Sequence, residues 1–173
     1  QRQMCIRDRG LIAARSIALL SYRTYQSYVK TQTNPGNHVT DEFLASSYQN
    51  YQGQKLADRF CAYSYVTLSR AMDAHNVGRK RESIEAALGT ISAKVLVIGI
   101  TTDQLFPTEE QIFLAKHIGN ASYAEIQSEY GHDGFLIETD QIEKLFKQFL
   151  TDQTPENYSQ IIHNNQTQFK LVK

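Results

Sequence analysis

The pattern of apolar and polar positions changes once along the chain. From residue 10 to residue 92, apolar and aromatic residues recur among good helix formers, as in GLIAARSIALLSYRTYQSYV, which predicts helices. Pro and Gly adjoin in TNPGN at 33–37, so we expect a break there. From residue 93 strand and helix patterns alternate. The segment AKVLVIGI is apolar on both faces, which is typical of a parallel strand covered on two sides.

The segments that follow complete a β-α-β-α order. We expect a helix in TEEQIFLAKHI, with Thr108 and Gln111 at the spacing of a capping box, then a strand in ASYAEIQS and an amphipathic helix in TDQIEKLFKQFL. This order implies two parallel strands joined by a right-handed crossover. The predicted fold class is therefore α/β, with a helical region at 10–92 and a β-α-β-α unit at 93–150.

The two ends of the sequence differ from its middle. Residues 1–9, QRQMCIRDR, have no apolar periodicity and no signal-peptide layout, and we interpret them as a non-native leader. Residues 151–173 are polar and rich in Asn and Gln, which is typical of a loose tail.

Composition excludes several classes of partner. The 18 basic and 18 acidic residues give a formal charge of zero, so no general field attracts nucleic acid or an anionic membrane. No apolar run approaches the roughly 18 residues that a spanning helix needs. Cys5 and Cys61 lie far apart without metal-ligand spacing. We therefore expect no metal, reduced thiols and a cytoplasmic location, with Cys61 as a small buried residue.

Candidate chemistry follows the ends of the two predicted strands. Asp103 comes shortly after the first strand, and His132 lies in the loop after the second, between Gly131 and Gly134, which we expect to turn the backbone sharply. Parallel strands end at one edge of a sheet, so both side chains should lie there. A carboxylate that accepts from one imidazole nitrogen leaves the other to take a proton from a hydroxyl. The alternatives are a turn-capping aspartate and a solvated histidine.

The order of acid and then histidine matches α/β-hydrolases, in which a nucleophilic serine on a GxSxG turn precedes both. No GxSxG occurs in this sequence. The serines before Asp103 lie in helical stretches or, for Ser92, just ahead of a strand.

Four segments resemble the homoserine O-acetyltransferase family, which has the α/β-hydrolase fold: GLIAARSIALLSYR, YQGQKLADRFCAYSYVTLSRAMDAHNVGR, AKVLVIGITTDQLFP and YGHDGFLIE. The resemblance implies a C-terminal fragment, in which a helical lid precedes the last two parallel strands and their helices. It implies ping-pong transfer of acetyl from acetyl-CoA to the hydroxyl of L-homoserine, in methionine biosynthesis, with the serine ahead of residue 1. Asp103 and His132 match the family's acid and base.

Three further residues fit a substrate that carries both charges of an amino acid. Asp133, beside His132, is placed to meet the ammonium group. Arg15 lies among apolar neighbours, where a guanidinium is costly unless a carboxylate pairs with it, and Tyr22 lies two helical turns further along the same face. The resemblance supports all three as substrate contacts. The alternatives are an internal salt bridge for Arg15 and simple packing for Tyr22.

The resemblance also implies small-molecule partners, L-homoserine and acetyl-CoA as co-substrates, without a resident cofactor. It implies a homodimer through the lid helices in the full-length protein. We expect the chain alone to be inactive, because it lacks a nucleophile. Acyl transfer to serine, or from succinyl-CoA, remains an alternative, and so does a non-catalytic module in which the helices of 43–72 bind a partner.

Overall fold

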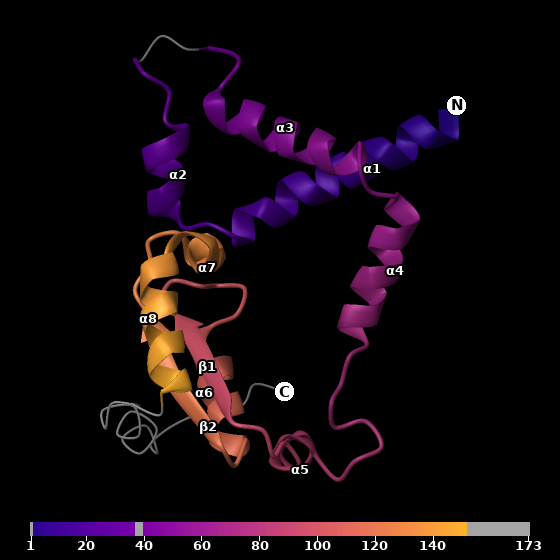
Figure 1. The fold of residues 1–173 in the computed structure, drawn as a ribbon. Helices are drawn as coiled ribbons and strands as arrows, with labels where there is room; N and C mark the ends of the chain where they lie inside the picture. Colours follow the sequence, from indigo (N-terminus) through magenta and orange to yellow (C-terminus); the bar gives the residue numbers. More distant parts are fainter. Residues whose placement is uncertain (1, 37–39, 152–173) are drawn as a thin grey trace. The chain divides into compact units, whose positions relative to one another are not determined.

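The computed structural model describes residues 2–36 and 40–151 of the chain (Figure 1). The chain divides into two compact units, Gln1–His75 and Asn76–Lys173. The predicted tail, 151–173, lies outside the described residues apart from Thr151. In the described ranges, no helix combines the length and the apolar character that crossing a lipid bilayer requires.

The first unit is built from helices. They are α1 (Arg2–Ala18), the 3-10 turn η1 (Leu19–Ser21), α2 (Tyr25–Gln32), α3 (Leu44–Ala57) and α4 (Ala62–Asp73). The break between α1 and α2 comes at Thr24, whose hydroxyl accepts a hydrogen bond from the Ser27 N–H and so begins a new helix. The helix α2 ends just before TNPGN, which confirms the predicted break.

The first helix begins earlier than the apolar pattern predicted. That pattern becomes regular at Gly10, whereas α1 begins at Arg2 and so includes residues 2–9. Arg, Gln and Met in this segment are good helix formers, and intrinsic propensity continues the helix although the segment has no apolar stripe.

The helices α1 and α3 approach each other closely at a glycine. Gly53 of α3 is buried, and a Cβ atom there would lie 2.7 Å from the carbonyl oxygen of Ile12 in α1. Near this point the Ser16 hydroxyl is 3.0 Å from the carbonyl oxygen of Gln49 in α3, to which it donates. The missing side chain at position 53 therefore sets the distance between the two helices.

The substitution Gly53→Ala should destabilise the helical unit, because the added methyl group would meet the Ile12 carbonyl oxygen and the side chains of Ile12 and Ser16 in α1. We expect the free energy of unfolding to fall by about 1–3 kcal/mol, measured by urea denaturation and circular dichroism. Gly10→Ala is the matched control. No atom lies within 4 Å of a Cβ placed at Gly10, and alanine is favoured over glycine inside a helix. Equal losses in the two variants would contradict the close approach at Gly53.

The second unit is a two-stranded parallel sheet between helices. The strands β1 (Val95–Ile100) and β2 (Ala121–Ile126) pair in parallel, with Val95 opposite Ala121. The helices are α5 (Ile84–Gly89) before β1, α6 (Thr108–His117) between the strands, and η2 (Gly131–Asp133), α7 (Gly134–Ile137) and α8 (Thr139–Leu150) after β2. The predicted β-α-β-α order and the parallel pairing are confirmed.

Each face of this sheet is covered by one long helix (Figure 1). On one face Ile100 and Ile126 pack with Leu145 of α8. On the other face Val97 and Tyr123 pack with Ala115 of α6. The expectation that β1 is a strand covered on two sides is therefore confirmed.

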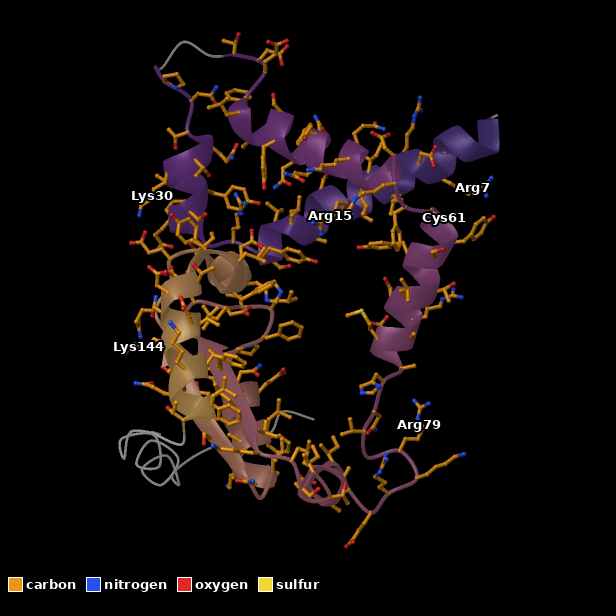
Figure 2. The ribbon with its side chains drawn as sticks, viewed as in Figure 1. Arg7, Arg15, Lys30, Cys61, Arg79 and Lys144 are labelled. Atoms are coloured by element: carbon orange, nitrogen blue, oxygen red, sulfur yellow. The ribbon has the colours of Figure 1, made fainter. Side chains whose placement is uncertain are left out.

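Two local expectations are wrong, and both concern the start of a helix. Thr108 is the first residue of α6, not its cap, because Pro107 already occupies the N-cap position and no side-chain hydrogen bond caps the helix. Cys61 is exposed, not buried, because it is the N-cap of α4, a helix whose residues are all at least partly exposed (Figure 2). Hydrogen bonds from the backbone of Ser64 and Tyr63 lower the pKa of the Cys61 thiol.

Candidate active site

The side chains of Asp103 and His132 meet beyond the carboxyl ends of the two strands. Asp103 lies three residues after β1, and His132 lies in η2, after β2. Nδ1 of His132 is 2.9 Å from Oδ2 of Asp103, so the predicted approach is confirmed. The Asp103 side chain is only 5% exposed and that of His132 is 20% exposed. The acid is therefore buried beneath a histidine that solutes can reach.

Both oxygens of Asp103 are held in place. Oδ1 accepts hydrogen bonds from the backbone N–H groups of Leu105 and Phe106, at 2.8 and 2.9 Å. This turn fixes the orientation of the carboxylate and directs Oδ2 to His132. Because a carboxylate only accepts, Nδ1 of His132 carries the proton. Nε2 is then the nitrogen whose lone pair can take a proton from a hydroxyl.

Two phenylalanines flank the imidazole ring. The ring centroids of Phe106 and Phe135 lie 5.1 and 5.5 Å from that of His132, both in edge-on geometry. Both phenylalanines are about half exposed, so they place apolar surface beside the base. Sequence reasoning missed them. The available signal was that each follows a member of the pair, Asp103 or His132, by three residues.

The glycines around His132 have different roles. Gly131 is buried and has a φ of +63°, the left-handed region that favours glycine, so the predicted sharp turn is confirmed there. Gly134 has a φ of −54°, which any residue adopts, so the expectation of a second sharp turn is wrong. A Cβ atom at Gly134 would lie 2.8 Å from Oγ of the buried Ser128, and close packing explains the glycine instead.

The predicted substrate-binding residues fall in both units. Asp133 is half-buried in η2, next to His132. Arg15, on α1, lies with its guanidinium carbon 5.1 Å from the ring centroid of Tyr22 (Figure 2). The helix α1 passes directly into η1 at Leu19, and Tyr22 keeps a right-handed helical conformation, with φ −83° and ψ −23°. The expectation that Arg15 and Tyr22 lie along the same face is therefore confirmed, and a cation–π contact joins the pair. Convergence of Arg15 and Tyr22 with Asp133 stays a prediction.

The structure bears on the alternative roles of Arg15 and on metal binding. Among the described residues, no carboxylate forms an ion pair with Arg15, which counts against the internal salt bridge.

Within the same part of the chain, no cluster of His, Cys, Asp and Glu side chains could hold a metal ion.

The substitution Gly134→Ala should disturb the loop that carries His132, because the new methyl group would overlap the Ser128 side chain. We expect a loss of about 1–3 kcal/mol in the free energy of unfolding, measured by urea denaturation. Gly119→Ala is the matched control, since no atom lies within 4 Å of a Cβ placed at Gly119. A Gly134→Ala variant as stable as the control would show that the loop does not need this packing.

The fold and the Asp103–His132 pair together define a class of protein. The α/β-hydrolase fold combines a parallel sheet that has helices on both faces with an acid after one strand and a histidine after the next. The crystal structure of esterase E22 superposes with a TM-score of 0.68 at 18% identity, over 82% of this chain and 42% of the esterase. The chain has the α/β-hydrolase fold, in the form of a C-terminal part of it.

Sequence comparison finds the chain similar to homoserine O-acetyltransferases. The homoserine O-acetyltransferase of Cyclobacterium marinum is 47% identical over 141 residues, which are 82% of this chain and 40% of that protein. The crystal structure of homoserine O-acetyltransferase from Staphylococcus aureus is 26% identical, with a TM-score of 0.66, over 98% of this chain and 46% of that one. No family model matches the chain. The resemblance to homoserine O-acetyltransferases is confirmed, and the chain spans about 40% of the length of the curated relatives it matches.

Proposed function

We propose that the complete protein transfers an acetyl group from acetyl-CoA to the hydroxyl of L-homoserine, a step of methionine biosynthesis, with His132 as the base and Asp103 as its partner. The observation that carries this proposal is the 2.9 Å contact between Nδ1 of His132 and the buried Asp103 carboxylate. The chain that holds this pair is 47% identical to a homoserine O-acetyltransferase.

In this proposal His132 moves a proton in each half of a ping-pong reaction. Nε2 first takes the proton of a serine hydroxyl that these 173 residues do not supply, while the serine oxygen attacks the thioester carbonyl. The proton passes to the departing sulfur of coenzyme A. Nε2 then takes the proton of the homoserine hydroxyl, whose oxygen attacks the acyl-enzyme, and returns it to the serine oxygen. In both halves Asp103 stabilises the imidazolium that forms.

The proposal assigns the two charges of homoserine to separate residues. Asp133 follows His132 directly, so it receives the α-ammonium close to the reacting hydroxyl. Arg15 receives the α-carboxylate, and the Tyr22 ring holds the guanidinium in place. Two observations support Arg15: its side chain is half-buried, and among the described residues no carboxylate already pairs with it.

The proposal extends to the assembly of the complete protein. We infer a cytoplasmic homodimer with a contact through the helices of the first unit. The exposed apolar side chains of α4 support this contact, since Tyr63 and Met72 are 64% and 72% exposed.

The 173-residue chain alone should not acetylate homoserine, because no serine in it lies on a GxSxG turn beside His132. We expect turnover only from a hybrid completed with the upstream part of the Cyclobacterium marinum relative, measured as thiol release from acetyl-CoA. His132→Ala in the hybrid should lower kcat by about 10⁴-fold or more.

The same assay separates the alternatives. Faster turnover with serine or with succinyl-CoA would change the assigned acceptor or donor. Turnover by the chain alone would contradict the proposal and direct the search for a nucleophile to Cys61 and Ser64.

In the hybrid, Arg15→Ala should raise the KM for homoserine about 10- to 100-fold, because a charge-assisted contact to the substrate carboxylate is lost. Formation of the acyl-enzyme from acetyl-CoA should be unchanged, since homoserine takes no part in it. Arg9→Ala, at an exposed position on the same helix, is the matched control. Equal losses in both half-reactions would make Arg15 a structural residue.

A further inference from the structure

The loops that carry Asp103 and His132 are joined by a second link beside the acid–base contact. The Thr102 hydroxyl donates a hydrogen bond to the backbone carbonyl of Ser128, at 2.8 Å. The same oxygen accepts a hydrogen bond from the backbone N–H of Gly131, at 3.1 Å. Thr102 directly precedes Asp103, and Gly131 directly precedes His132. One hydroxyl therefore ties the residue before the acid to the residue before the base.

The acid–base contact depends on the position of the Gly131 backbone. His132 can reach Asp103 only if the chain turns at Gly131, where φ is +63°. The Thr102 hydroxyl holds the N–H of that turn and the carbonyl three residues earlier. Because both partners are backbone groups, the link fixes the path of the loop and not merely one side chain.

The other hydrogen bonds in this region either stay within one of the two loops or cross between them with a longer, exposed contact. The Ser128 hydroxyl accepts from the Tyr130 N–H, within the histidine loop. The Asp103 Oδ1 contacts lie within the acid loop. Thr101 does reach across, but its hydroxyl is exposed and lies 3.4 Å from the Gln127 side chain. Thr102, which is partly buried, makes shorter contacts with backbone on the other side.

We propose that Thr102 is a positioning residue that holds His132 in register with Asp103. It touches no reacting atom and acts through the Gly131 turn. This inference rests on the proposed function for its catalytic meaning, although the geometric effect on His132 can be measured without catalysis. Thr102→Val removes the hydroxyl with little change of shape, Thr102→Ser keeps it, and Thr101→Val is the matched control one residue away.

The first test uses nuclear magnetic resonance of the 173-residue chain with isotope-labelled histidine and glycine, in which His132→Gln identifies the His132 signals. We expect wild-type His132 to be protonated at Nδ1, with slow exchange of that proton, and the Gly131 amide to be protected. Thr102→Val should expose the Gly131 amide and speed exchange at Nδ1 about tenfold, the effect of losing one hydrogen bond. Thr102→Ser and Thr101→Val should behave like the wild type.

Several results would overturn the inference. One is an unchanged His132 in a folded Thr102→Val chain, and another is equal effects of Thr102→Val and Thr101→Val. Should the Thr102→Val chain fail to fold, the same exchange measurements on the Thr102→Ala chain and on the Gly131 amide of the wild-type chain test the inference. An unprotected Gly131 amide in the wild type would show that the link does not hold the turn.

The second test measures catalysis in the completed hybrid. Thr102→Val should lower kcat about tenfold while the KM for homoserine changes less than about twofold, because orientation of the base is lost and substrate contacts remain. Thr102→Ser should restore kcat. A rise in KM without a fall in kcat would contradict the positioning role. A wild-type hybrid without acetyl transfer would instead overturn the proposed function, and the magnetic resonance result on Thr102 would stand.

Discussion

The parallel register of β1 and β2 is the constraint on which the candidate site depends. Ile100 lies opposite Ile126, so both strands end at the same level, and the Thr101 N–H extends the pairing to the Ile126 carbonyl, at 3.2 Å. A slip of one residue would move one loop by about 3.3 Å and reverse the faces of its strand. A hydrogen bond of 2.9 Å between His132 and Asp103 could not survive that shift.

Packing on the α6 side of the sheet fixes this register. The Tyr123 side chain is almost fully buried, and a Cβ atom at Gly99 would lie 2.7 Å from its hydroxyl oxygen. The aromatic ring therefore fits only beside a position that has no side chain. Its hydroxyl donates to Glu125, at 2.7 Å, and burial together with Glu125 raises the pKa of Tyr123 above its usual range. The phenol thus remains a neutral donor in a site where its anion would be costly.

Beyond the ends of the strands, hydrogen bonds between side chains and backbone take the place of the regular hydrogen bonds between β1 and β2. Gln141 of α8 accepts from the Gln127 N–H and donates to the Gln127 carbonyl, so it pairs with the end of β2 much as a neighbouring strand would. Asp103 and Thr102 make the corresponding contacts for the loops themselves. The base therefore stands on a loop whose polar groups are tied to two other parts of the chain, the helix α8 and the loop after β1, which favours a fixed geometry over a mobile one.

The features that depend on local pattern could be predicted from the amino-acid sequence. A strand apolar on both faces, a strongly amphipathic closing helix, and the order of acid and then histidine were enough to predict β1, β2, α8 and the meeting of Asp103 with His132. These predictions hold because periodicity and the direction of parallel strands fix where the loops emerge.

Other features depend on contacts between residues that are distant in the sequence, and only the folded chain reveals them. No local pattern separates Thr102 from Thr101, yet only the first joins two backbone groups of the other loop. Gly134 is a glycine because the Ser128 side chain packs against it. Such contacts arise where elements pack together, and their partners are set by three-dimensional distance, which spacing along the chain does not encode.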